Sequence, residues 1–255
     1  MRIFFTFILI SLFLYGCRKD KYFKGPDFYS DDFENYYILE ELISTDDQLW
    51  SMTQQTRSSN TIIVDTSNSH NSVKSLKFFA EKSEDGNSSK CSISKQNMAF
   101  WDGETMRVTA WYFIEGSASL DWLFLLDVEE QVAVGAGPGI RIAMVNNQLR
   151  AERAKIKLGD ITQPAGQEID FPRDQWVELI WEVKLSQKKK GYVKLWQNGQ
   201  LILEDNNTRT LPKDKLYFQQ GTKGMMSSVE IGITANSNDN PLVIWVDDVT
   251  FEKIN

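Results

Sequence analysis

The sequence predicts an all-β protein in which two antiparallel sheets stack as a jelly-roll sandwich. Short runs of β-branched and aromatic residues follow one another along the chain, and clusters of Gly, Asn, Asp and Ser separate them. Only one segment, residues 36–43, has the pattern of a helix, and it is short. About a dozen strands in a chain of 255 residues suit two stacked sheets.

The predicted strands follow from apolar runs and alternation, taken in chain order. Residues 61–65, 73–80, 105–114, 122–128 and 140–145 are rich in Val, Ile, Leu, Phe, Trp or Thr. Residues 176–185 give the clearest pattern, because Val177, Leu179, Trp181 and Val183 alternate with mostly polar neighbours and predict one buried face. The last runs cover residues 216–219, 229–235 and 243–252.

A tight hairpin is the best-defined local feature. Residues 192–197 and 200–204 are predicted strands, and only Asn198 and Gly199 separate them. Both residue types readily take the positive φ angles that a two-residue hairpin turn requires. We therefore expect these two strands to pair directly.

The N-terminus resembles a bacterial lipoprotein signal. Arg2 precedes an apolar run from Ile3 to Tyr15, which is too short to cross a bilayer core of ~30 Å. The tetrad Leu14 to Cys17 resembles a lipobox, which implies that Cys17 is lipidated and begins the mature chain. This predicts a signal peptide (residues 1–16), a lipidated tether (17–30) and a jelly-roll domain (31–255), anchored by lipid at the outer membrane or cell surface. An ordinary secretory signal or a short N-terminal anchor is the alternative.

Charge and cysteine content exclude some partners. Removing residues 1–16 takes away only Arg2, so 27 basic residues face 35 acidic ones and the net charge changes from −7 to −8. Nucleic acid is therefore an unsuitable partner, since binding it needs clustered positive charge. With Cys17 acylated, Cys91 has no partner for an intramolecular disulfide. Burial of apolar surface must then stabilise the fold.

Several segments resemble the concanavalin A-like lectin and glucanase superfamily, and within it the polysaccharide lyases of the alginate lyase and heparin lyase I kind. These are the strand that begins at Trp176, the hairpin from Gly191 to Gly199, the run from Tyr217 to Gly221 and the run from Trp245 to Val249. The resemblance spans residues 32–253. It implies a concanavalin A-like jelly roll more firmly than any one chemistry.

The resemblance also implies three catalytic motifs, and the equivalent segments here lack their reactive residues. Cleavage of a uronate by β-elimination needs a group that neutralises the carboxylate, a base and an acid. The segment from Cys91 to Lys95 lacks the expected Arg and Glu, and the segment from Leu125 to Asp127 lacks Gln and His. After Tyr217, Gln219 replaces the expected Lys and Lys223 replaces the expected catalytic Tyr.

The retaining glucanases of the superfamily offer another catalytic pattern, in which acidic residues alternate on one strand face. Asp127 and Glu129 have that spacing, but Leu125 occupies the position of the nucleophile. Asp127 and Glu129 are therefore expected to end a strand and face solvent.

Taken together, these features predict a membrane-anchored lipoprotein that binds a polysaccharide or oligosaccharide without cleaving it. Sugar rings pack on aromatic faces beside amide and charged groups. The candidate binding residues are Tyr192, Lys194, Trp196, Trp111, Trp122, Tyr217, Gln219, Lys223 and Arg141. The alternative is a divergent polysaccharide lyase that uses Tyr217, Lys223, Arg141 and His70, and a purely structural lipoprotein is a third possibility.

A structural Ca²⁺ ion is also expected. Jelly-roll carbohydrate modules often hold this ion between the first and the last strand, and hard carboxylate oxygens suit it. The candidate ligands are Asp31, Asp32, Glu34, Asp247 and Asp248. The alternative is that these are ordinary surface carboxylates at strand ends.

Overall fold

The computed structural model describes residues 25–46, 48–130, 139–212 and 224–254. Several predicted features lie outside the described residues: the lipidation site Cys17, the strand at residues 216–219 with the candidates Tyr217 and Gln219, and the candidate Lys223. No helix in the described part of the chain is both long enough and apolar enough to cross a membrane.

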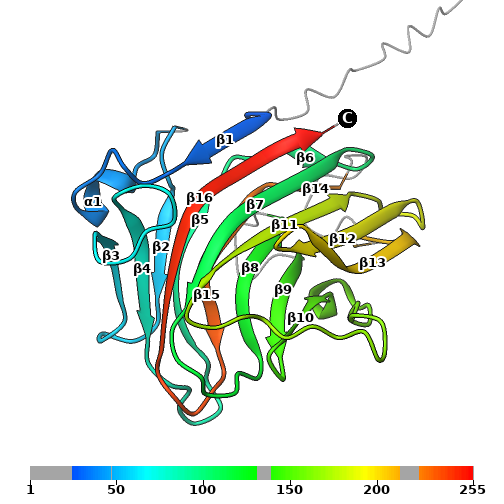
Figure 1. Ribbon diagram of the computed structural model, residues 1–255. Coiled ribbons are helices and arrows are strands. Elements are labelled where there is room, and N and C mark those ends of the chain that lie inside the picture. The colour runs from blue at the N-terminus through cyan, green and yellow to red at the C-terminus, as the bar shows by residue number, and fades with distance from the viewer. Residues whose placement is uncertain (1–24, 47, 131–138, 213–223, 255) are drawn as a thin grey trace, which may run out of the picture.

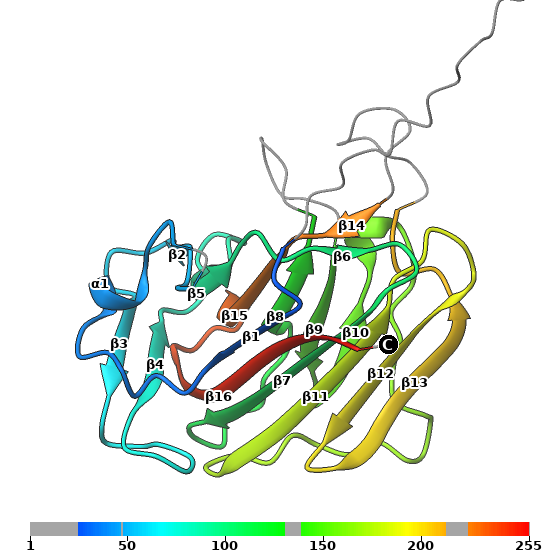
Figure 2. The same ribbon diagram turned by 90° about the horizontal axis from the view of Figure 1, so that it is seen from above.

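The described strands form two stacked antiparallel sheets, as the sequence predicts (Figures 1 and 2). The larger has eight strands in the order β13-β12-β11-β7-β16-β4-β3, with β1 added to β16. Its members are β1 (Phe28–Asp31), β3 (Thr61–Asp65), β4 (Ser75–Ala80), β7 (Thr105–Ile114), β11 (Trp176–Lys184), β12 (Gly191–Gln197), β13 (Gln200–Thr208) and β16 (Leu242–Ile254).

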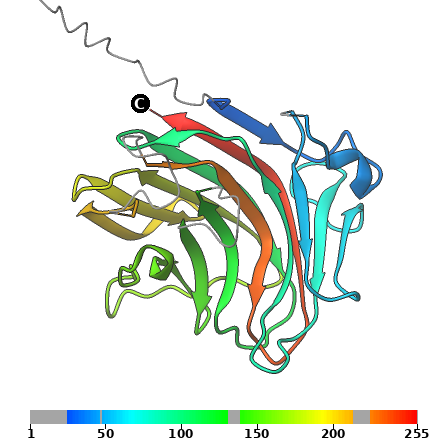
Figure 3. The same ribbon diagram turned by 180° about the vertical axis from the view of Figure 1, so that it is seen from behind.

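The smaller sheet has six strands in the order β10-β9-β8-β15-β5-β2. Its members are β2 (Met52–Gln55), β5 (Ser89–Lys95), β8 (Leu123–Glu129), β9 (Gly139–Val145), β10 (Gln148–Glu152) and β15 (Ser228–Asn236). Figure 3 shows β15, in orange, running beside the green strands of this sheet. The remaining elements are the pair β6 (Phe100–Trp101) and β14 (Met225–Met226), the helix α1 (Leu39–Leu42) and the 3₁₀ turn η1 (Ala154–Ile156).

Most predicted strands are confirmed to within a few residues. The hairpin is also confirmed, since β12 pairs with β13 and both turn residues, Asn198 and Gly199, have positive φ angles of 49° and 74°. Strands β1, β2, β5, β6, β10 and β14 were not predicted. Strand β1 begins at Phe28, two residues before the predicted end of the tether.

The core lies between the two sheets. Tyr112, Trp181 and Phe78 reach it from the eight-stranded sheet, and Ile93, Val128 and Ile231 reach it from the six-stranded sheet; none is more than 1% exposed. Because side chains alternate between the two faces of a strand, their sequence neighbours on the six-stranded sheet lie on the face opposite the core. That outer face carries the candidate site.

Candidate active site

One row of polar side chains crosses the outer face of the six-stranded sheet. The strand register makes each member the direct neighbour of the next, on five strands from β5 to β10. Directly opposed residues on neighbouring strands have Cβ atoms about 5 Å apart, so their side chains interact. The row consists of Ser94, Glu230, Asp127, Arg141 and Glu152.

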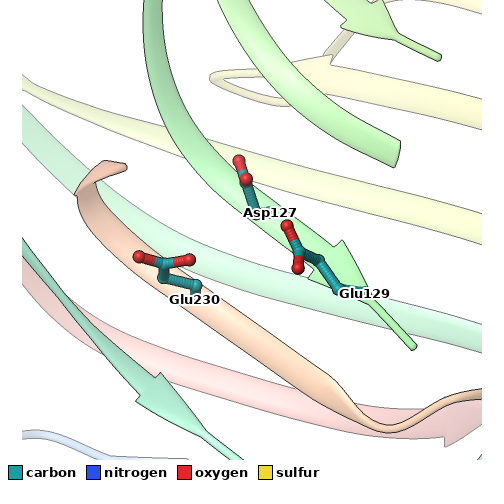
Figure 4. Close-up of side chains that lie close together, drawn as sticks. All are labelled: Asp127, Glu129 and Glu230. Carbon is teal, nitrogen blue, oxygen red and sulfur yellow. The ribbon is translucent and has the colours of Figure 1, made fainter. Parts of the chain in front are cut away.

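Three carboxylates meet at the centre of this row (Figure 4). Asp127 and Glu129 lie two residues apart on β8, and Glu230 faces them from β15; one oxygen of each lies within 4.8 Å of the others. Asp127 is only 4% exposed, so the expectation that it faces solvent is wrong. Strand β8 does end at Glu129, but it is an inner strand of the sheet, and the side chains of Lys155 and Thr234 contact the Asp127 carboxylate.

Lys155 supplies the positive charge of this cluster. It lies in η1, just after β10, and its Nζ atom donates to Asp127 Oδ2 at 3.4 Å and also contacts the Glu129 carboxylate. Thr234 fixes the other side of the cluster, because its hydroxyl donates to Asp127 Oδ1 at 2.8 Å. Lys155 was not predicted, because a lysine in a polar segment after a short strand carries no distinguishing pattern.

Burial at the centre of the row changes the proton equilibrium of Glu230. Burial raises its pKa from the ordinary value of 4.5 to about 7, and the negative charge of Asp127 adds to the effect. The hydroxyl of Ser92 on β5 donates to its Oε1 and opposes the increase. A carboxyl group that changes protonation near neutral pH can act as a catalytic base or acid.

Arg141 and Trp122 are the predicted site residues that lie on this face. Arg141 donates from Nε to Glu152 Oε2 at 2.7 Å, and its guanidinium lies 4.0 Å from the centre of the Phe124 ring. Phe124 in turn stacks on Trp122, with ring centres 6.1 Å apart. The two aromatic rings therefore lie beside the polar row, along β8 in the direction of its first residue.

The other described candidates for glycan binding lie on the eight-stranded sheet. Tyr192, Lys194 and Trp196 share one face of β12, where the ammonium of Lys194 pairs with Glu204 at 2.9 Å. Trp111 lies on β7 and stacks on His70, with ring centres 3.6 Å apart. His70 Nδ1 is 2.7 Å from Asp248 Oδ2, so His70 is a partly buried member of an aromatic cluster on this sheet rather than of the carboxylate site.

The five predicted Ca²⁺ ligands separate into two groups. Asp31, Asp32 and Asp248 line one cavity of about 330 Å³ between β1 and β16, together with Ser30, Asn35, Tyr36, Val249 and Thr250. The oxygen donors of this lining suit a hard cation.

The other two predicted ligands are not part of that lining. Glu34 accepts hydrogen bonds from the backbone of Val73 and Lys74, and Asp247 accepts one from the backbone of His70. Among the described residues, three acidic or other metal-binding side chains converge within 4.8 Å only at Asp127, Glu129 and Glu230. The Ca²⁺ ion stays a prediction.

Comparison with known proteins gives one family match and several related folds. A family model described as polysaccharide lyase matches residues 42–250. A search of curated proteins returned no match to the sequence.

Three solved structures show the same fold at low sequence identity. An endo-β-1,4-glucuronan lyase from the fungus Trichoderma reesei is 14% identical, with a TM-score of 0.62 over 80% of this chain and 90% of that chain. The cellulose-induced protein Cip1 is 16% identical, with a TM-score of 0.60 over 87% and 95%. The alginate lyase Aly36B is 10% identical, with a TM-score of 0.56 over 90% and 98%.

The family match corrects two predictions. The first prediction was a protein that binds glycans without cleaving them, and the second was accordingly that it is not an enzyme; both are wrong. They rested on the loss of reactive residues from three strand motifs. Glu129, Glu230 and Lys155 lie outside those three segments, and Asp127, which ends one of them, is not a residue that the motif requires.

Proposed function

The chain belongs to the polysaccharide lyase family, and on that premise we propose that it cleaves a uronate-containing polysaccharide by β-elimination at the Glu230 and Lys155 cluster. Two of the structural neighbours are a glucuronan lyase and an alginate lyase, and both of their substrates are polymers of uronic acids. This is the lyase alternative of the sequence analysis, with a different set of reactive groups.

The observation that carries the proposal is a near-neutral carboxyl group close to a lysine ammonium. Glu230 has a pKa of about 7, and its carboxylate lies within 4.8 Å of Asp127 and Glu129, which both contact Lys155. A base and an acid held this close can act on adjacent atoms of one sugar ring.

In the proposed step, ionised Glu230 removes the proton from C5 of the uronosyl residue. The electron pair of that C–H bond forms the C4–C5 double bond, and the bond between C4 and the glycosidic oxygen breaks. The ammonium of Lys155 then gives a proton to the leaving oxygen. The products are a chain with a new hydroxyl end and a chain with an unsaturated uronate, and no other reactant is consumed.

Arg141 provides the charge that this chemistry needs at the substrate carboxylate. Negative charge builds up on the uronate carboxylate as the C5 proton leaves, and a fixed cation stabilises it. Arg141 is the row neighbour of Asp127, and its side chain is 19% exposed, so one side of the guanidinium stays open to a ligand. Its bond to Glu152, which is itself buried, fixes its orientation.

The residues outside the described part keep their proposed roles. Tyr217, Gln219 and Lys223 are further candidates for substrate contacts, from the resemblance of the run that begins at Tyr217. A lipid on Cys17 would anchor the enzyme in the bacterial cell envelope, where extracellular polysaccharide is accessible.

The test is production of unsaturated uronate by the purified protein on glucuronan, alginate and glycosaminoglycans, followed by ultraviolet absorbance of the conjugated double bond. Wild type should give product, and Glu230→Gln and Lys155→Met should lose at least a hundredfold in rate. The matched control is Glu84→Gln, an exposed turn residue, which should match wild type.

The pH dependence checks the role of Glu230 separately. As a base it must be ionised, so the rate should rise as pH increases through about 7. Asp127→Asn should move that rise to lower pH, since the Asp127 charge raises the pKa of Glu230. Absence of product from wild type on every polymer, or full activity of Glu230→Gln, would overturn the proposal.

A further inference from the structure

Trp122 combines two unfavourable features on the outer face of the six-stranded sheet. Its φ angle is 49°, in the left-handed region that a bulky side chain rarely adopts, and its side chain is 40% exposed. Such a backbone conformation costs on the order of 1–3 kcal/mol and is concentrated at functional sites. Neither feature is needed to fill the core, since Trp122 lies on the side away from it.

The contacts of Trp122 connect it to the proposed active site. Its ring stacks on Phe124, at an angle of 26° between the ring planes, and Phe124 carries the guanidinium of Arg141 on its face. Arg150 on β10 places a second guanidinium 5.6 Å from the centre of the Trp122 ring. Trp122 is five residues before Asp127, so at about 3.3 Å per residue it lies roughly 15 Å along the strand from the carboxylate cluster.

Two polar cavities lie in this region, one lined by Trp122 and the other by Arg150. The one of about 300 Å³ is lined by Trp122 itself with Ser119, Asp121, Ser237, Asn238, Asp239 and Asn240. The other, of about 270 Å³, lies beside Arg150 and is lined also by Gln148, Leu149, Thr162, Gln163, Ala165 and Glu168. An exposed ring between amide and hydroxyl groups matches the surface of a pyranose, with its apolar C–H face and polar edge.

We propose that Trp122 and Arg150 form a distal subsite that binds one uronosyl residue of the substrate chain, several sugar units from the bond that is cut. The sugar ring packs on Trp122, its hydroxyl groups reach the cavity of Asn238 and Asn240, and its carboxylate pairs with Arg150. This inference rests on the proposed function, because it assumes that the chain passing Glu230 is a polyuronate. Binding at a remote unit helps to position the bond at the reacting groups, so long chains should be cut better than short ones.

The test compares chain lengths in variants that should fold. Trp122→Asn removes the ring, and asparagine tolerates the left-handed conformation, so its melting temperature should be at least that of wild type. We expect kcat/KM to fall about tenfold on polymeric glucuronan or alginate and to stay unchanged on the shortest oligosaccharide that is cut.

Trp122→Phe should restore part of the loss, and Arg150→Gln should weaken binding of uronate polymers but not of a neutral glucan. The control is Phe28→Ala, an exposed aromatic residue on β1 of the other sheet.

Binding is measured independently in the Glu230→Gln background, by retardation in gels that contain the polymer. Trp122→Asn should be retarded less than its parent, with an apparent Kd about tenfold higher. If wild type forms no unsaturated product but Trp122→Asn still reduces retardation, the proposed function fails and the subsite stands. If wild type forms product and Trp122→Asn keeps the wild-type dependence on chain length, the subsite is wrong and the proposed function stands.

Discussion

Replacing Glu230 by glutamine should stabilise the protein at alkaline pH while removing its activity. In the folded protein the pKa of Glu230 rises from 4.5 to about 7, mainly because the carboxyl group is buried. Each unit of difference between the pKa values in the folded and unfolded states corresponds to about 1.4 kcal/mol. Ionised Glu230 therefore lowers the free energy of unfolding by roughly 3 kcal/mol. Glutamine has nearly the same shape and cannot ionise, so this cost disappears.

The sign of the effect defines the pH window. Because the folded state holds this proton more tightly than the unfolded state, the folded protein binds more protons than the unfolded chain between pH 4.5 and about 7. Stability from this group is fully present below pH 4.5 and is lost as the pH rises through about 7. The gain in Glu230→Gln over wild type should therefore be near zero at pH 4.5 and approach its maximum above pH 8.

Urea unfolding at pH 4.5 and pH 8, followed by tryptophan fluorescence, measures this difference directly. Glu84→Gln, at an exposed position beside a turn, should have the stability of wild type at both pH values. An equal effect of Glu230→Gln at both values, or a loss of stability at pH 8, would refute the buried, near-neutral carboxyl group on which the proposed mechanism depends.

Three further outcomes follow from features described above. Gly199→Val should lower the free energy of unfolding by on the order of 1–3 kcal/mol, since it places a β-branched residue at a φ angle of 74°; an unchanged urea midpoint would contradict the turn geometry. If Ca²⁺ occupies the cavity between β1 and β16, a chelator should lower the melting temperature and added Ca²⁺ should restore it, and identical melting curves would exclude the ion. Cys17→Ser should abolish acyl labelling and release the protein from the membrane fraction, whereas an unlabelled wild type would contradict lipidation.

The sequence predicts the fold well because burial on one face leaves a periodic pattern. Strand β11 shows this, with buried and partly buried residues alternating along its whole length. Strand β5 was missed although nearly all of it is buried, since its sequence is rich in serine and lacks a run of apolar residues. Its place in the sheet comes from pairing with β2 and β15, which no local pattern records.

The site was predicted less well, because its residues are brought together by register rather than by spacing. Arg141 and Trp122 were chosen as glycan contacts and do lie on the face of the cluster, but Trp111 and Trp196 have equally suitable chemistry and lie on the other sheet. Glu230 was not chosen, since an isolated acid in an apolar strand looks like an ordinary surface residue. Only the pairing of β15 with β8 places it opposite Asp127, whose charge adds to the burial that raises the pKa of Glu230.

The proposed active site depends on the pairing of five strands, because each strand contributes one residue of the polar row. Ser94 and Glu230 are neighbours across β5 and β15 although 136 positions separate them in the sequence. Asp127 and Arg141 extend the row on the other side of β15, from β8 and β9. Contacts this distant form slowly, because a long loop must close before any pairing energy is gained. Until β15 pairs with both β8 and β5, Glu230 does not lie beside Asp127, whose charge helps to raise its pKa. A chain that has formed the hairpin of β12 and β13 but has not yet paired β15 with β8 therefore lacks the proposed active site.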